Sequence, residues 1–343
     1  MSGRPAQGGG ATPRAGLYAG HVHVYSIPLR TRFRRIDARD GVLIHGRAGW
    51  AEVSPFWDYD DVESAAWLRA AREAATVPSP PHVRDRIPVN VTVPAVDGER
   101  ARAIVLASGG CTTAKVKVAE PGQSVDDEIE RLEAVRDALG ARGRIRIDAN
   151  GGWDVDTAVA RLGVLDRAAG GLEYVEQPSP TVADLAAVRR RTSVPVAADE
   201  SIRRAEDPYE VKRQDAADVV VLKVQPLGGV RACLDLAADI GLPVVVSSAL
   251  ESSVGLAQGI ALAAALPELP YACGLATAHL LTDDTVVRPL LPVGGSIAVR
   301  RPVVSPAALE RTQAPDDVAH RWRARLDRLA DVLDVPADER AAW

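Results

Sequence analysis

Five short segments of the chain carry side chains suited to metal binding and proton transfer. They are Lys115-Val116-Lys117, Asp148-Ala149-Asn150, Glu176-Gln177-Pro178, Asp199-Glu200 and Val221-Leu222-Lys223. The acids that begin the middle three segments follow one another at intervals of 28 and 23 residues, and Lys223 comes 24 residues after the last of them. An interval of this length matches one strand plus one helix, so each segment is predicted to end a separate strand of a parallel sheet.

Three carboxylates at the ends of adjacent strands can converge on one hard cation. Asp148, Glu176 and Asp199 supply oxygen ligands, and Mg²⁺ is the ion predicted to bind them, with Mn²⁺ as an alternative. Without a cation, the three carboxylates would repel one another and raise each other's pKa. Each acid taken singly could instead cap the helix that follows it. The repeated spacing of all three, together with the lysines, favours the metal site.

The lysines are predicted to perform acid–base chemistry on either side of this metal ion. Lys115 and Lys117 point the same way because strand side chains alternate, and two neighbouring ammonium groups are expected to lower each other's pKa. Lys117 is thus predicted to be the general base, and Lys115 to tune it and contact a substrate carboxylate. Lys223 is predicted to lie nearly opposite these two lysines, across the barrel, with the acid-bearing strands between them. Each lysine alone could equally be a surface residue.

The strands that position these residues are short β-branched runs that alternate with helical stretches. Eight such runs follow the proline-rich segment 78–81, centred on residues 89–93, 114–118, 145–149, 172–176, 195–198, 219–224, 244–247 and 271–275. No glycine-rich dinucleotide motif follows any of them. This pattern predicts an α/β fold with a (β/α) barrel, in which chemistry lies at the carboxyl ends of the strands.

The two ends of the chain are predicted to form a second unit. Alternating apolar residues from about 20 to 60 indicate a small antiparallel sheet, residues 61–76 a helix, and residues 316–334 a final helix. We expect a flexible leader at 1–18, a capping domain at 19–85, the barrel at 86–285, and a carboxyl-terminal segment at 286–343 that packs back on the capping domain. Both ends of the chain would then cover the barrel mouth.

Composition limits the expected partners and location. The 343 residues carry a net charge of −5, and no basic stretch is interleaved with aromatic residues, which argues against nucleic-acid binding. No apolar run approaches the roughly 20 residues of a membrane-spanning helix, and the three cysteines lack metal-ligand or disulfide spacing. We expect a soluble, cytoplasmic enzyme that acts on a small-molecule carboxylate without a membrane partner. The oligomeric state is left open.

The motifs resemble those of the enolase superfamily, specifically its muconate-lactonizing subgroup. The resemblance runs from about Tyr25 to Leu281 and is carried by the five segments above, in the same order and spacing. It implies an enolase-type (β/α)7β TIM-like barrel with an α+β capping domain built from the amino-terminal segment and the carboxyl-terminal tail. Within the subgroup, segments 25–30, 247–256 and 273–277 are most similar to o-succinylbenzoate synthases, whereas Trp50-Ala51-Glu52 departs from the expected Trp-Gly-Glu.

This resemblance implies a Mg²⁺-dependent reaction that begins by removing a proton next to a carboxylate. The implied step is the syn-dehydration of 2-succinyl-6-hydroxy-2,4-cyclohexadiene-1-carboxylate to o-succinylbenzoate in menaquinone biosynthesis. N-succinylamino acid racemase and dipeptide epimerase, from the same subgroup, use the same residue types and stay open as alternatives. Two interpretations from other classes are a metal-free retaining glycosidase that uses Glu176 and Asp199, and a barrel that binds ligands without catalysis.

Three residues near the strand-end substrate site are predicted to contact the substrate. Ser247 and Ser248 are expected to hold its succinyl carboxylate, although serine-rich turns also begin helices. Gly274, in the last predicted strand, is expected to line the same site.

Three further residues are predicted to support the metal ligands. Asn150 is expected either to bind near the metal ion or to cap a helix. Arg146 precedes Asp148 by two residues and so faces the same interior, where a structural ion pair that orients the carboxylates is favoured. Glu200, next to Asp199, is expected to play a similar supporting role.

Overall fold

The computed structural model describes residues 22–204, 207–336 and 340, and its barrel strands form one parallel sheet. The predicted leader, residues 1–18, lies outside the described residues. The sheet follows the order β11-β10-β9-β8-β7-β6-β5, so each strand pairs with its neighbour in the chain. The bounds are β5 (Val91–Val93), β6 (Thr113–Lys117), β7 (Arg144–Asp148), β8 (Leu172–Glu176), β9 (Val196–Ala198), β10 (Val219–Leu222) and β11 (Val244–Val246).

A short extended segment closes this sheet at the place of the eighth predicted strand. Val89 pairs with Cys273 on one edge, and Ser247 pairs with Gly274 on the other, each as a single parallel bridge. The Gly274 N–H donates to the Val246 carbonyl at 2.8 Å. Because the segment bonds to both edges, the predicted (β/α)7β TIM-like barrel is confirmed, although its eighth strand is reduced to two bridges.

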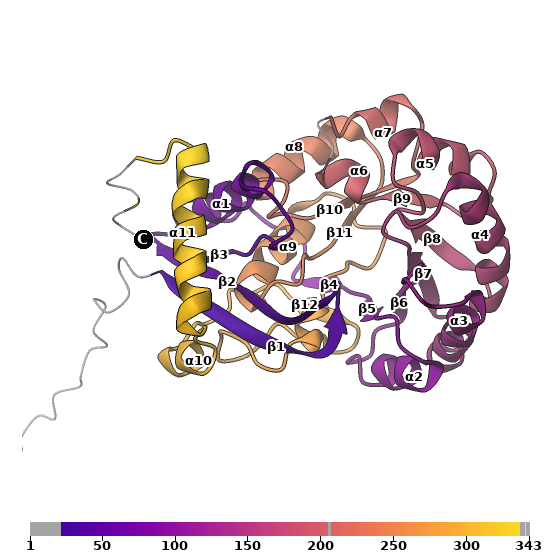
Figure 1. Ribbon diagram of the computed structural model, residues 1–343, viewed down its shortest axis with the longest axis horizontal. Coiled ribbons are helices and arrows are strands. Elements are labelled where there is room, and N and C mark those ends of the chain that lie inside the picture. Colours follow the sequence, from indigo (N-terminus) through magenta and orange to yellow (C-terminus); the bar gives the residue numbers. More distant parts are fainter. Residues whose placement is uncertain (1–21, 205–206, 337–339, 341–343) are drawn as a thin grey trace, which may run out of the picture.

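Helices follow the strands and cover the outside of the barrel (Figure 1). Their bounds are α2 (Gly98–Leu106), α3 (Val125–Leu139), α4 (Val155–Ala169), α5 (Val182–Arg189), α6 (Glu200–Arg203), α7 (Glu210–Arg213), α8 (Val230–Ile240) and α9 (Ser253–Ala265). Ser124 and Asp127 form a reciprocal capping box at the start of α3, and Asp154 caps α4. α4 and α8 end at Gly170 and Gly241, both in the left-handed conformation. Local side chains therefore set where these helices begin and end.

The barrel strands are apolar because both of their faces are covered. In β10, Val220 and Leu222 belong to the layer between the sheet and the helices, whereas Val219 and Val221 pack with Tyr174 in a separate inner cluster. Side chains alternate between these two layers along a strand. The residue after β10, Lys223, continues the inward-facing series.

The other unit is an antiparallel sheet packed against helices. The sheet has the order β1-β2-β3, with β1 (His23–Phe33), β2 (Ile36–Gly46) and β3 (Gly49–Val53). α1 (Asp61–Thr76) follows it, and α11 (Asp316–Val332), from the far end of the chain, lies beside α1 (Figure 1). A ribbon of β4 (Arg86–Pro88) and β12 (Ser296–Ala298), a 3₁₀ turn η1 (Thr277–Leu280) and α10 (Pro306–Arg311) complete the described elements. The proposed domain boundaries at 85/86 and 285/286 stay predictions. No helix in the described part of the chain is long and apolar enough to cross a membrane.

A buried arginine fixes α11 to the segment that follows the capping sheet and to the start of α1. Arg325 is 2% exposed. It donates hydrogen bonds to the carbonyls of Phe56 and Tyr59, at 3.0 and 2.8 Å, and to the Ser64 hydroxyl at 2.7 Å. A buried guanidinium requires such partners. These bonds tie the carboxyl-terminal helix to the segment between β3 and α1.

A buried carboxylate joins the capping domain to the barrel. Glu52, on β3, is fully buried and accepts hydrogen bonds from the hydroxyls of Tyr25 and Ser54, both at 2.7 Å. From the barrel it accepts the N–H groups of Ser252 and Gly255, both at 3.1 Å, at the start of α9. A carboxylate of one domain therefore caps a helix of the other.

Glu52→Ala is expected to lower the free energy of unfolding by about 3–5 kcal/mol, because buried hydroxyl and amide donors of both domains lose their acceptor. Urea unfolding followed by circular dichroism measures this change. Glu133→Ala, on an exposed position of α3, is the matched control and is expected to change the free energy by less than about 0.5 kcal/mol. Equal losses in the two variants would contradict the docking role of Glu52.

Candidate active site

The charged segments meet at one end of the barrel. Lys115 and Lys117 lie on β6, Asp148 and Glu176 end β7 and β8, and Asp199 and Lys223 directly follow β9 and β10. In the sheet register, Lys117 pairs with Asp148, which in turn pairs with Glu176. The side chains thus form one charged row across neighbouring strands, at the carboxyl ends where the chemistry of such barrels lies.

Two lysines share the first two carboxylates of the charged row. Lys115 Nζ lies 2.8 Å from Glu176 Oε1 and 3.2 Å from Asp148 Oδ2. Lys117 Nζ lies 2.6 Å from the same Asp148 oxygen. Both acids are 1% exposed, and Lys115 is 7% exposed. A buried ammonium group therefore bridges two buried carboxylates.

The third carboxylate binds the predicted Lys223. It also binds an arginine, Arg203, that the sequence analysis missed. Lys223 Nζ lies 2.5 Å from Asp199 Oδ2, and Arg203 Nε donates to Oδ1 at 2.9 Å. Arg203 also binds Glu200 at 2.6 Å and the hydroxyl of Tyr59, which belongs to the capping domain. An arginine four residues after a strand-end acid could have been found, since residues at that spacing share one face of a helical turn. The contact with Tyr59 joins segments too distant in the chain for such a signal.

Burial and nearby charges shift the pKa values of the acids in different directions. For Asp148 and Asp199, burial raises the pKa, but the neighbouring cations outweigh it and hold the pKa below its usual range. For Glu176, burial and the Asp148 carboxylate raise the pKa to about 7, against the opposing effect of Lys115. Glu176 is therefore the acid of the charged row that takes up a proton most readily near neutral pH.

The predicted lowering of the Lys115 pKa is wrong. Burial alone would lower this pKa, but the carboxylates of Glu176 and Asp148 outweigh burial and raise the pKa above the ordinary lysine value. The prediction weighed only the second ammonium group, because the distance to the acids of the next two strands cannot be known from spacing along one strand. Lys115 is a permanent cation of the site near neutral pH.

Asn150 binds the lysine side of the site rather than a helix end. Its Oδ1 accepts a hydrogen bond from Lys117, and its Nδ2 donates to Glu200 Oε1 at 3.2 Å. Asp154 is the residue that caps α4, so the helix-cap alternative for Asn150 is wrong. Since Glu200 also pairs with Arg203, a continuous set of polar contacts links Lys117 to Arg203.

The predicted substrate-binding residues come together where the barrel closes. Ser247 and Gly274 face each other across the closing seam, and a Cβ atom at Gly274 would clash with Ser247 Oγ, so a larger residue there would displace the Ser247 hydroxyl. Ser248 Oγ lies 2.7 Å from Thr277 Oγ1. The cap of α9 is Ser252, so Ser247 and Ser248 do not begin that helix.

Arg146 lies in the barrel interior and forms the ion pair that the sequence favours. It is fully buried, and its Nε donates to Glu173 Oε2 at 2.5 Å. Its Nη1 donates to the Ala272 carbonyl at 2.7 Å, and its guanidinium lies 4.7 Å from the centroid of the Tyr174 ring. These contacts join three strands at the barrel centre. An orienting effect on the acids stays a prediction.

The capping domain reaches the charged row with aromatic side chains. Lys117 Nζ lies 5.7 Å from the centroid of the Phe33 ring, at the end of β1. On the far side of the row, Tyr59 binds Arg203. Phe33 and Tyr59 belong to the amino-terminal unit, in which the sequence analysis assigned no site residue. The amino-terminal unit therefore covers the barrel mouth on both sides.

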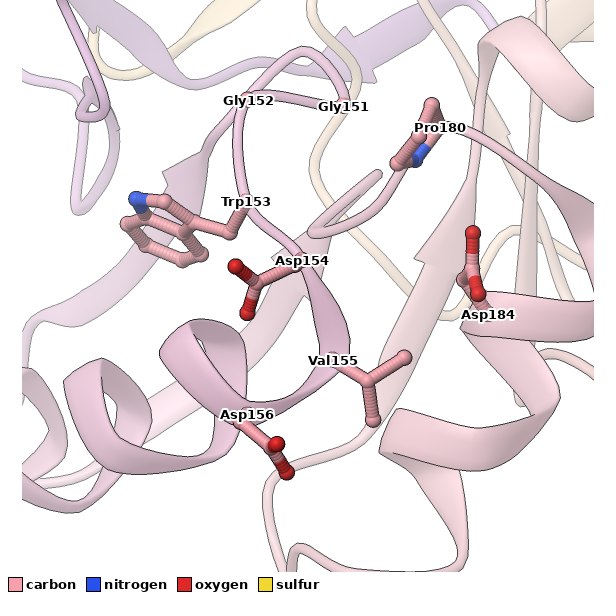
Figure 2. A pocket seen from close by; sticks show the side chains of 8 residues that line it. All are labelled: Gly151, Gly152, Trp153, Asp154, Val155, Asp156, Pro180 and Asp184. Carbon is pink, nitrogen blue, oxygen red and sulfur yellow. The ribbon is translucent and has the colours of Figure 1, made fainter.

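A hollow beside the charged row is lined by acids that already have partners. It has a volume of about 550 Å³ and lies at the starts of α4 and α5, where Figure 2 shows Asp154, Asp156 and Asp184 along its wall. Asp154 caps α4, Asp184 binds the Thr181 hydroxyl at 2.7 Å, and Asp156 pairs with Arg191 at 2.7 Å. These contacts are structural, so the hollow is separate from the chemistry of the row.

The donor set of the charged row fits a hard divalent cation. Asp148, Glu176 and Asp199 offer only oxygen atoms, the ligands that such ions prefer, and Lys115 already places one positive charge between two of them. As the side chains stand, no group of three His, Cys, Asp or Glu residues within the described ranges is arranged to hold a metal ion. The carboxylate oxygens are directed at ammonium and guanidinium groups instead, so binding a metal ion requires some of these contacts to rearrange.

Two family models cover most of the chain. Residues 24–75 match the family described as Enolase N-terminal domain-like, and residues 98–303 match Enolase C-terminal domain-like. The chain belongs to the enolase superfamily. Enzymes of this superfamily generally use a divalent metal ion, so the metal-free glycosidase interpretation is set aside.

Relatives of known function are similar to this chain over nearly its whole length. It is 62% identical over 319 residues to o-succinylbenzoate synthase from Thermobifida fusca (strain YX), a match that covers 93% of this chain and 96% of the relative. The o-succinylbenzoate synthase from Mycolicibacterium smegmatis is 52% identical over 308 residues, covering 90% of this chain and 94% of the relative.

Solved structures share the fold at much lower identity. Muconate lactonizing enzyme from Pseudomonas fluorescens has a TM-score of 0.73 at 20% identity, covering 85% of this chain and 98% of its own. The L-Ala-D/L-Glu epimerase from Bacillus subtilis has a TM-score of 0.70 at 21% identity, covering 84% of this chain and 98% of its own. The barrel with its capping domain is thus a fold that this chain shares with both enzymes.

Arg203→Met is expected to lower the free energy of unfolding by about 3–5 kcal/mol, because the buried Asp199 loses one of the two cations that bind it among the described residues. Arg204→Met removes the next arginine, whose ion pair with Glu63 is partly exposed, and should lower it by at most about 1 kcal/mol. Urea unfolding of both variants in EDTA measures the difference. If Arg203→Met costs no more than Arg204→Met, the buried Asp199 does not depend on Arg203.

Proposed function

We propose that this chain is an o-succinylbenzoate synthase, which performs the syn-dehydration of 2-succinyl-6-hydroxy-2,4-cyclohexadiene-1-carboxylate to o-succinylbenzoate in menaquinone biosynthesis. The observation that carries the proposal is the 62% identity to the Thermobifida fusca relative over nearly the full length of both chains. The charged row supports it, because it offers the groups that proton removal beside a carboxylate requires. A small-molecule carboxylate substrate and a location in the cytoplasm are part of the proposal.

Three acids are proposed to hold Mg²⁺, with Mn²⁺ as a substitute. They are Asp148, Glu176 and Asp199, all three of them buried. The bound ion supplies positive charge beside the substrate carboxylate, where negative charge grows as the neighbouring carbon loses its proton. Arg203 holds Asp199 through one oxygen and thereby orients the other toward the barrel interior.

Lys117 is proposed to remove the proton. Its side-chain nitrogen is bound by Asp148 at 2.6 Å and by Asn150, and Phe33 lies beside it, so the group is held in one place at the barrel mouth. The neutral amine takes the proton from the carbon next to the substrate carboxylate. The resulting ammonium then gives a proton to the departing hydroxyl, which leaves as water from the same face. One residue on one face therefore accounts for a syn elimination.

Lys223 is proposed to act as a fixed cation on the opposite face. Its contact with Asp199 at 2.5 Å holds it in place, where its charge stabilises the negative charge that develops on the substrate. Lys115 keeps Glu176 and Asp148 together and extends positive charge toward the substrate carboxylate. The seam formed by Ser247, Ser248 and Gly274 is proposed to bind the succinyl carboxylate, with Glu200 and Arg146 as supports.

Racemisation or epimerisation is the second candidate function. The observation that favours it is the position of Lys117 and Lys223 on opposite sides of the row, each bound to a different acid. Two opposed bases can exchange protons on both faces of an α-carbon. A solved N-succinyl Arg/Lys racemase from Bacillus cereus has a TM-score of 0.68 at 18% identity, a level that supports a common fold alone.

The purified protein is expected to dehydrate the cyclohexadiene substrate faster than it exchanges the α-proton of an N-succinylamino acid into D₂O. Absorbance and proton NMR measure the two rates. Lys117→Ala is expected to lower dehydration by about 10²–10⁴-fold, because the general base is lost, with an unchanged circular dichroism spectrum. Lys212→Ala, on the exposed helix α7, is the matched control and should keep full activity.

The three other outcomes of this assay point to different conclusions. Rapid exchange with slow dehydration would favour the racemase. Full turnover in Lys117→Ala would contradict its role as base. Neither reaction in the unaltered protein would favour the non-catalytic barrel.

EDTA is expected to abolish turnover, and Mg²⁺ or Mn²⁺ to restore it. Metal binding is expected to release a fraction of a proton near neutral pH, since Glu176, with its pKa raised to about 7, must be deprotonated to bind a metal ion. The released fraction should grow as the pH falls below 7 and disappear well above it, so affinity increases with pH. Calorimetry in two buffers of different ionisation enthalpy measures the release, and Glu176→Gln should eliminate it. Turnover that survives complete removal of metal would contradict the metal site.

A further inference from the structure

A second cavity lies in the seam between the capping domain and the barrel. Its volume is about 350 Å³, within the range of about 300–1,000 Å³ that small-molecule sites occupy. Its walls come from the β2–β3 turn, the end of α1 with segment 77–82, the starts of α8 and α9, and segment 299–302. No side chain of the charged row is among its described lining residues. Substrate chemistry at the barrel mouth therefore leaves this cavity without a role.

Gln258, on α9, lines the cavity and is unusual for a buried side chain. It is 6% exposed, and neither its amide nitrogen Nε2 nor its amide oxygen Oε1 has a hydrogen-bond partner among the described residues. Buried polar groups are nearly always hydrogen-bonded, because leaving them unpaired is costly. A ligand with an acceptor at its polar end could pair with the N–H groups of the amide.

Arginines outnumber acids among the residues that line this cavity. Three arginines line the cavity, Arg231, Arg300 and Arg301, against one acid, Glu73. Arg231 is held by Glu73 at 3.3 Å and by the carbonyl of Pro78 at 3.1 Å, both of which line the cavity. These bonds use only part of the five N–H donors of the guanidinium. An excess of guanidinium groups with spare donors selects an anion, above all a carboxylate.

The rest of the wall is apolar. It includes Trp50 from the capping domain, Val254, Ala257 and Ile260 from α9, and Val299 from the segment after β12. Apolar walls with a few convergent polar groups are typical of sites that bury most of a small organic ligand. A compact inorganic anion would leave this apolar surface uncovered.

We propose that this cavity is a second binding site, for a small organic carboxylate with an apolar or aromatic body. The carboxylate meets the arginines and the Gln258 amide, and the body packs against Trp50 and the face of α9. Trp50 lies on β3 of the capping domain, and Gln258 lies on α9 of the barrel. Glu52 joins the same two elements, so the ligand contacts both domains at once. The inference does not depend on the reaction performed at the charged row.

The test uses 2-naphthoate as the probe, titrated calorimetrically into the full-length protein with Mg²⁺ present. The protein is expected to bind one naphthoate that Lys117→Ala does not affect. Ala261→Trp, which fills the cavity from α9, should weaken binding at least tenfold with turnover unchanged, and Arg301→Ala should weaken it to a similar degree. Neutral 2-naphthamide should bind at least tenfold more weakly than naphthoate, because it lacks the charge that the arginines select.

Gln258→Leu tests the same site if Ala261→Trp fails to fold, since leucine resembles glutamine in shape. It is expected to weaken naphthoate binding and, by removing an unpaired buried amide, to raise the thermal unfolding midpoint of the ligand-free protein. Absence of binding at millimolar probe would overturn the proposal. So would binding that Lys117→Ala abolishes, which places the probe at the charged row, or binding that Ala261→Trp, Arg301→Ala and Gln258→Leu all leave unchanged.

Discussion

Negative charge buried at one end of the barrel is the constraint on which the rest of the structure depends. Asp148, Glu176 and Asp199 are at most 1% exposed, and buried carboxylates are stable only when cations and hydrogen bonds compensate them. β6 and the residue after β10 supply the lysines, and α6 supplies an arginine. A shift of one residue in the register of any of these strands would turn its charged side chain into the helix layer. The parallel sheet and its register are therefore a requirement of the charged row.

The capping domain completes what the barrel begins. Phe33 lies beside Lys117, and Tyr59 binds Arg203, so residues from before the barrel contact both sides of the row. Glu52 caps α9 from the other domain, and Arg39 donates to the Leu250 carbonyl at 3.1 Å in the loop that precedes this helix. The loop between β11 and α9 thus takes its shape from contacts across the seam. The substrate contacts proposed for that loop would therefore depend on how the two domains are docked.

Sequence spacing could predict the charged row because a repeated βα unit places equivalent residues at one end of the sheet. It could not predict Tyr59 or Phe33, because both reach the site from another domain, whereas the four-residue spacing between Asp199 and Arg203 was a signal in the sequence. The same limit explains the wrong pKa direction for Lys115, whose acids lie on neighbouring strands. The eighth strand was placed correctly but is only two bridges long, since β-branched composition indicates extended backbone and not the extent of its pairing.

The proposed function assigns proton removal and substrate choice to different parts of this molecule. Solved structures at about one-fifth identity share the barrel and its capping domain, whereas relatives at 52–62% identity share one reaction name. A fold common to a lactonizing enzyme and an epimerase cannot by itself specify dehydration. On the proposed assignment the charged row supplies a base, a metal site and a fixed cation, which would serve any reaction that begins next to a carboxylate. What distinguishes one such reaction from another must therefore lie in the surrounding contacts: the closing seam at Ser247 and Gly274, and the capping residues that reach over the row.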